Sequence, residues 1–184
     1  VIEGNQSSYG ALNSTGALTL IRTTVRNNTA TVGGGGLSVG GAVTIQESLL
    51  EGNVAAVGGA LYVTESAAVT IDRSHFLLNL ADAPVDIEAQ GGAIISYGDL
   101  RISGATFEAN RAEGFGGAIA AGPGSNDAFT QIANSTFVAN EAGERGGAID
   151  NDRGRLEVVN STFSANRAAA GGAIQNFLGP ANLY

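Results

Sequence analysis

The 184-residue sequence contains no cysteine and no methionine, and only three of its residues are proline. Without cysteine, no disulfide can hold the fold together. The scarcity of proline excludes both a proline-rich disordered tract and, despite 28 glycines, a collagen helix. No apolar run approaches the roughly 20 residues that a membrane-spanning helix needs, so no transmembrane segment is expected. The chain begins at Val1, as a processed product or a piece of a longer protein would.

Positive charge is also scarce. Nine basic residues stand against 17 acidic ones, which gives a formal net charge of −8. Such a chain is repelled by phosphate backbones and by anionic lipid surfaces, so nucleic acid is not expected as a partner. The apolar content of 43% is nevertheless sufficient for a buried core.

Three short motifs recur in the same order along the chain. The first is Gly-Gly-Ala followed by an aliphatic residue, at 58–61, 91–94, 116–119, 146–149 and 171–174, with weaker copies at 9–12 and 35–37. The second is a short alternating segment, at 18–20, 43–45, 69–71, 100–102 and 156–158, with a degraded copy at 130–132. Alternation of this kind places the two aliphatic side chains of each copy on one face of a strand.

The third motif is an apolar residue three positions before an asparagine. These asparagines are Asn5, Asn28, Asn53, Asn79, Asn110, Asn140 and Asn166, and they are spaced by 23, 25, 26, 31, 30 and 26 residues. The variation excludes a rigid heptad or collagen period, but it suits coils whose strands are constant and whose corner loops vary. The glycine pairs would cost about 1 kcal/mol per residue inside a helix.

A period of about 25 residues with three short strands per coil is typical of a parallel β-helix. The sequence therefore predicts an all-β, right-handed parallel β-helix of about six to seven coils, with residues 1–184 forming a single domain that is uncapped at both ends. Handedness follows from the usual chirality of parallel crossovers.

Stacked coils align equivalent residues. Phe76, Phe107, Phe137 and Phe163 are expected to form an internal aromatic stack. The asparagines at 28, 53, 79, 110, 140 and 166 are expected to form a structural ladder of side-chain hydrogen bonds, as amides do in cross-β stacks. The glycine pair follows this corner, where a positive φ or a close backbone approach excludes a β-carbon.

The alternation of Gly-Gly-Ala-Ile with Phe-x-x-Asn resembles the repeats of chlamydial polymorphic outer membrane proteins and of large secreted bacterial β-helix proteins. The phrase Asn-Ser-Thr-Phe-Ser-Ala-Asn at 160–166, followed by the glycine motif at 171–174, is similar to theirs. The resemblance implies an extracellular or cell-surface location and an adhesive or structural role.

Candidate catalytic groups are few. Polysaccharide-active β-helices need clustered carboxylates on one outer face. Asp150 and Asp152 stand beside two arginines, and the longest corner loop holds Asp82, Asp86 and Glu88. Neither grouping repeats in adjacent coils, so we interpret both as solvated loop charge. The single histidine, His75, is expected to point outward. We therefore predict no enzymatic activity, no metal and no cofactor.

Both ends of the chain are incomplete coils in this interpretation. We hypothesise that copies stack head to tail into an open filament or matrix. The residues expected at the two assembly ends are Val1, Ile2, Asn5, Ile174, Phe177, Leu178, Leu183 and Tyr184.

Two alternatives remain open. One is an adhesin-like passenger segment of a longer surface β-helix, which would bind a glycan or a host surface protein through variable loops at 80–90 and 120–128. The other is a polysaccharide-active enzyme with an acidic groove that bridges several coils.

Overall fold

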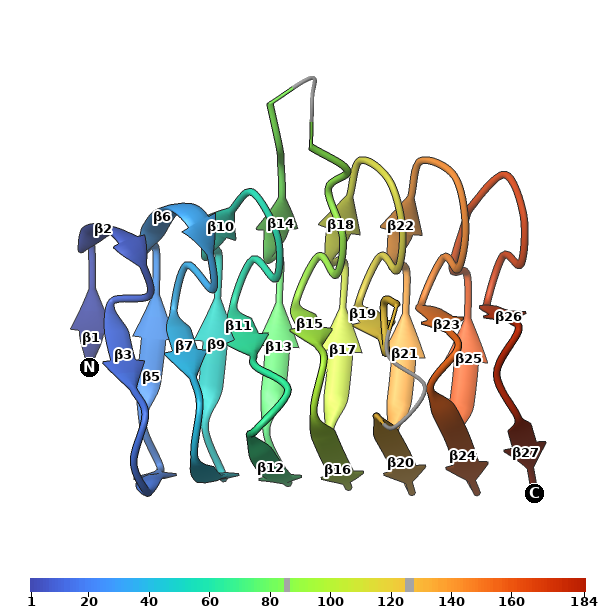
Figure 1. Cartoon of the computed structure of the whole chain (residues 1–184), viewed down its shortest axis with the longest axis horizontal. Coiled ribbons are helices and arrows are strands. Elements are labelled where there is room, and N and C mark those ends of the chain that lie inside the picture. The colour runs from blue at the N-terminus through green and yellow to red at the C-terminus, as the bar shows by residue number, and fades with distance from the viewer. Residues whose placement is uncertain (85–86, 125–127) are drawn as a thin grey trace.

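The chain winds as a column of short strands. The computed structural model describes residues 1–84, 87–124 and 128–184, and within them it contains 27 strands and no helix (Figure 1). All strand pairs are parallel, and each strand inside a sheet pairs with its equivalents in the preceding and following coils. The result is an all-β parallel solenoid of seven coils, which agrees with the predicted fold class and with the predicted six to seven coils.

The strands form four sheets, which we call A to D. Sheet A contains β1 (Ile2–Glu3), β5 (Thr24–Arg26), β9 (Leu49–Glu51), β13 (His75–Leu77), β17 (Thr106–Glu108), β21 (Thr136–Val138) and β25 (Thr162–Ser164). Sheet B contains β2 (Gln6–Tyr9), β6 (Thr29–Gly33), β10 (Val54–Ala55), β14 (Leu80–Ala81), β18 (Arg111–Ala112) and β22 (Glu141–Ala142).

Sheet C contains β3 (Leu12–Ser14), β7 (Leu37–Val39), β11 (Leu61–Val63), β15 (Ile94–Ser96), β19 (Ile119–Ala121), β23 (Ile149–Asp152) and β26 (Ile174–Phe177). Sheet D contains β4 (Leu18–Ile21), β8 (Ala42–Gln46), β12 (Ala68–Asp72), β16 (Asp99–Ser103), β20 (Phe129–Ala133), β24 (Arg155–Val159) and β27 (Ala181–Leu183).

The coil differs from the sequence-based prediction in its strand count, which is four rather than three. The additional strands form sheet B, directly after each ladder asparagine. From β10 onward they are two residues long, and two residues are too few to show alternation. The seventh coil has no sheet B strand but continues as far as β27, whose Ala-Asn-Leu was not recognised as a copy of the alternating motif.

Alternation along each strand determines which side chains enter the core. In sheet D, Val43 and Ile45 are 2% and 0% exposed, whereas Thr44 between them faces outward beside Thr19 and Thr70. The four phenylalanines of sheet A form a continuous internal stack, with ring centroids 4.7, 4.7 and 4.8 Å apart and planes within 10° of parallel. Burial of these apolar columns is the main source of stability.

The glycine pairs are required by the turn into sheet C. Gly116 has φ +64°, a conformation that disfavours a β-carbon. A β-carbon on Gly117 would lie 2.2 Å from the carbonyl oxygen of Gly147 in the next coil. The first glycine therefore supplies the turn, and the second allows two coils to approach.

Among the described residues, no helix is long and apolar enough to cross a membrane.

Candidate functional site

The asparagine column is a directional hydrogen-bond ladder. At each interior coil, the backbone N–H and the side-chain Nδ2 of one asparagine both donate to Oδ1 of the asparagine in the next coil, at 2.9–3.2 Å. Nδ2 also donates to a backbone carbonyl of the preceding coil, as Asn110 does to Phe76 at 2.9 Å. Asn28, Asn53, Asn79, Asn110 and Asn140 are at most 1% exposed.

The column starts at Asn5 and ends at Asn166, and these two ends differ chemically. Asn5 donates to Asn28 Oδ1 from its backbone N–H and its Nδ2. Its own Oδ1 accepts no hydrogen bond from any described residue. Asn166 accepts from Asn140 and donates Nδ2 to Phe137, while its backbone N–H has no acceptor in the described part of the chain.

A second ladder lies at the corner between sheets D and A. Ser48 Oγ accepts from the backbone N–H of Thr23, and Ser74 Oγ accepts from that of Ser48. Ser135 and Ser161 repeat the arrangement in later coils, at 3.1–3.2 Å. The sequence interpretation missed this ladder, although the recurrence of a serine two positions before the sheet A core residue could have predicted it.

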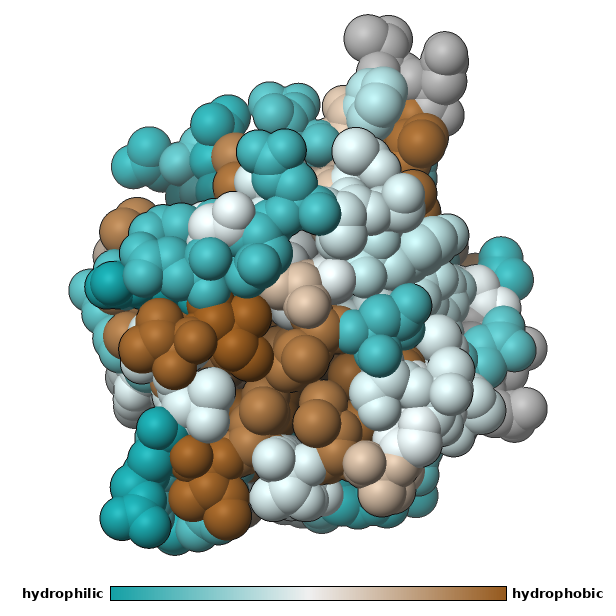
Figure 2. All heavy atoms as spheres, turned by 90° about the vertical axis from the view of Figure 1, so that its left-hand side faces the viewer, coloured by the Kyte–Doolittle hydropathy of each residue, from teal (hydrophilic) through white to brown (hydrophobic). Residues whose placement is uncertain are grey.

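Most of the predicted assembly residues are exposed at the terminal coils. Val1, Phe177, Leu178, Leu183 and Tyr184, all predicted assembly residues, are 83%, 42%, 73%, 63% and 77% exposed. Ile2 and Ile174 are half-buried against the core, and Asn5 is exposed. Figure 2 shows a contiguous apolar patch, rimmed by polar side chains, on the end of the column at which the chain begins. The N-terminal group of predicted assembly residues therefore lies at one open end of the column, and the C-terminal group lies at the other.

The interpretation of Asp150 as solvated loop charge is wrong. Asp150 lies within β23 and is 3% exposed, and Nη2 of the corner residue Arg145 lies 3.6 Å from its Oδ2. The Arg145 guanidinium in turn lies 4.2 Å from the centroid of the Phe115 ring. Burial raises the pKa of Asp150 to about 6, against the lowering effect of Arg145 and with a contribution from Asp152.

This acidic grouping does not extend along the column. The outward positions that pair with Asp150 are Ala120 in the preceding coil and Gln175 in the following one. Between Asp150 and Asp152, the buried Asn151 donates Nδ2 to Asn176 Oδ1 at 2.7 Å, a pair that the sequence interpretation missed. No group of three or more histidine or acidic side chains within residues 1–84, 87–124 and 128–184 is placed to hold a metal ion.

The remaining candidate catalytic residues do not lie close together. His75 Nε2 lies 3.3 Å from Glu108 Oε2 on the outer face of sheet A. Asp82 follows β14 and Glu88 lies near the far end of the same loop, whereas Asp86 falls outside the described residues, as do parts of both variable loops.

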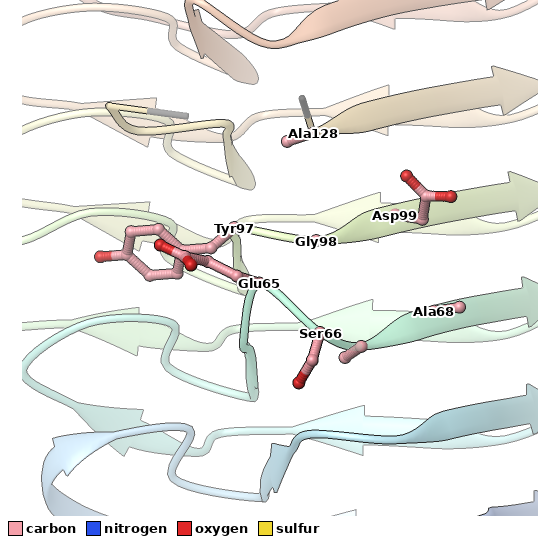
Figure 3. Close-up of a pocket in the computed structure, with 8 residues that line it drawn as sticks. Glu65, Ser66, Ala68, Tyr97, Gly98, Asp99 and Ala128 are labelled. Carbon is pink, nitrogen blue, oxygen red and sulfur yellow. The ribbon is translucent and has the colours of Figure 1, made fainter. Parts of the chain in front are cut away.

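A depression on the side of the column gathers two tyrosines and a carboxylate. It is lined by Tyr62, Thr64, Glu65, Ser66 and Tyr97 and has a volume of about 570 Å³. An adjoining depression of about 400 Å³ continues past Glu65 and Tyr97 toward Asp99. Figure 3 shows Glu65 and Tyr97 extending to the same side, with the carboxylate beside the ring, while Asp99 and Ser66 point elsewhere.

A comparison with protein families places the fold. The model of the right-handed β-helix region matches residues 4–183, nearly the whole chain. The chain belongs to the right-handed β-helix family. No curated protein and no solved structure matches this β-helix.

Family membership establishes the fold of this β-helix and leaves its activity open. The family includes both enzymes, such as pectate lyases and glycosidases, and proteins without catalytic activity. Its chemistry therefore depends on the residues of this particular chain.

Proposed function

We propose that this β-helix is a non-catalytic structural protein of the cell surface or extracellular space, whose copies stack head to tail into a fibre. The observation that carries the proposal is the polarity of the asparagine ladder. The resemblance of the repeats to secreted and outer-membrane repeat proteins supports the extracellular location.

Ladder polarity favours one mode of stacking. Asn166 offers a backbone N–H and a side-chain N–H at one end, and Asn5 offers a free Oδ1 at the other. A second copy placed with its Asn5 beyond Asn166 would continue the ladder with the bonds found in the interior. Head-to-head or tail-to-tail contacts would place acceptor against acceptor or donor against donor.

The core columns are complementary as well. If the strand register continues across the junction, apolar residues of one end meet apolar residues of the other. These pairs are Phe163 with Ile2, Ile174 with Leu12, Ala181 with Leu18 and Leu183 with Leu20 of the next copy. Six of these eight side chains are only partly buried in the single chain. Stacking would remove them from water and pair the free strand edges.

Charge does not oppose the contact, although the chain as a whole carries −8. The side chains of residues 1–21 include one charge, Glu3, and those of residues 160–184 include one, Arg167. The two ends therefore carry opposite signs and little charge to desolvate. Repulsion between copies is confined to the sides of the column.

A matched pair of variants on β3 tests the proposal. Leu12 packs against the core at the open end of the column, whereas its neighbour Asn13 is exposed on the outer face of the same strand. In sedimentation over a roughly hundredfold range of concentration, the natural chain should polymerise progressively. Leu12→Glu should remain monomeric, and Asn13→Glu should polymerise like the natural chain.

Circular dichroism on both variants controls for folding. A natural chain that stays monomeric throughout would contradict head-to-tail assembly. Equal polymerisation of folded Leu12→Glu and Asn13→Glu would also contradict it, because the end face would then play no part.

The second candidate function is an adhesin-like segment of a longer surface β-helix. The lateral depression at Tyr62, Glu65 and Tyr97 favours it, because a depression on the side of the column is accessible to a partner and has no part in end-to-end stacking. In that case flanking coils would cover the end faces.

A further inference from the structure

The lateral depression is built on a fixed aromatic pair. The Tyr62 and Tyr97 rings lie 5.6 Å apart at 49°, and Tyr9 meets Tyr62 edge-on at 6.3 Å. A β-carbon on Gly33 would lie 2.7 Å from Cδ2 of Tyr62, so the glycine makes room for the ring. Both rings of the pair remain partly exposed and line the depression.

Glu65 is the free charge of this depression. It is exposed and forms no hydrogen bond or ion pair with any described residue. Asp99, in the adjoining depression, is instead paired with Arg101 at 3.5 Å. The Thr64 and Ser66 hydroxyls bond to each other at 3.3 Å, and Ser66 also donates to Gly40.

The electrostatics suit a cation. Burial, with the neighbouring Tyr62 and the Glu65 charge, raises the pKa of Tyr97 to about 12, so the ring is neutral at physiological pH. Neutral aromatic faces attract cations through their quadrupole, and an adjacent carboxylate adds an ion pair. Among the described residues, no basic side chain lines either depression. A cation is favoured over a neutral sugar, because only a cation would form an ion pair with the free carboxylate of Glu65.

A guanidinium fits this arrangement better than an ammonium, because it is planar, stacks on aromatic rings and pairs with a carboxylate through two N–H groups. We propose that the depression formed by Tyr62, Glu65 and Tyr97 binds an arginine side chain of a partner protein. The site lies on the side of the third and fourth coils, so it is independent of end-to-end stacking.

Calorimetric titration with a capped Gly-Arg-Gly peptide tests the proposal, with the citrulline peptide as an uncharged isostere. The arginine peptide should bind and the citrulline peptide should bind at least about tenfold more weakly. Glu65→Gln and Tyr97→Leu should each lower the affinity for the arginine peptide by about fivefold. Glu141→Gln, which removes an exposed carboxylate from sheet B of the sixth coil, should leave the affinity unchanged.

Three results would overturn the proposal. The first is equal binding of the two peptides, or no binding of either. The second is an equal loss of affinity for the arginine peptide in Glu65→Gln and Glu141→Gln, which would mean that only the net charge of the protein matters. The third is a neutral oligosaccharide that binds in a Tyr97-dependent manner when the arginine peptide does not.

Discussion

Replacing Asn110 with alanine should lower the free energy of unfolding by more than the lost side-chain volume alone explains. Asn110 lies in the middle of the ladder and is 0% exposed. Its side chain accepts two hydrogen bonds from Asn79 and donates to the Phe76 carbonyl and to Asn140 Oδ1. Alanine removes all four bonds at once.

The size of the effect follows from what remains behind. The backbone N–H of Asn79 and one of its side-chain N–H groups lose their acceptor in a site without water access, and the Phe76 carbonyl loses the Asn110 side-chain donor. A buried polar group without a partner costs about 1–3 kcal/mol. Asn110→Ala should therefore lower the free energy of unfolding by about 3–5 kcal/mol.

Urea unfolding followed by circular dichroism measures this quantity. Asn13→Ala is the matched control, because Asn13 is exposed on the outer face of β3, and it should change stability by less than about 0.5 kcal/mol. If Asn110→Ala cost less than about 1 kcal/mol, the ladder would not stabilise the column and the reasoning from buried amides would be refuted.

Three further perturbations test other parts of the account by the same unfolding assay. Phe107→Ala should cost about 3–5 kcal/mol, because its ring is 0% exposed and stacked on both sides; a cost near that of a surface substitution would contradict the stack. Gly117→Ala should cost about 1–3 kcal/mol through a clash with the next coil, whereas Gly16→Ala, with no atom near its β-carbon position, should be tolerated. The raised pKa of Asp150 means that the folded state binds its proton more tightly, so stability falls as pH rises from about 4 to about 6. Asp150→Asn should therefore raise the free energy of unfolding by up to about 3 kcal/mol at neutral pH and by little near pH 4, and a pH-independent effect would contradict this.

The repeat made the fold predictable because stacked coils place equivalent residues in equivalent surroundings. Alternation at 43–45 identifies core and outer face without any tertiary information, and Phe-x-x-Asn marks both the aromatic stack and the corner that holds the amides. The parallel solenoid and its number of coils, to within one, follow from these local signals and their period.

Other features depend on contacts that a period cannot show. Sheet B escaped prediction because its strands are mostly two residues long and derive their regularity from pairing between coils. Asp150 was misjudged because its position within β23 and its contact with the corner residue Arg145 depend on tertiary structure. Tyr62 and Tyr97 occupy different positions of their coils, so their proximity arises from the turns and not from the repeat.

Electron microscopy of the purified chain over a range of concentrations tests head-to-tail stacking most directly. Seven coils at the interstrand spacing of about 4.8 Å give a subunit repeat of about 34 Å along the axis. Head-to-tail stacking predicts unbranched filaments with this repeat and with coils that continue through the junctions. These filaments should be absent in Leu12→Glu. Dispersed single rods at every concentration would contradict it.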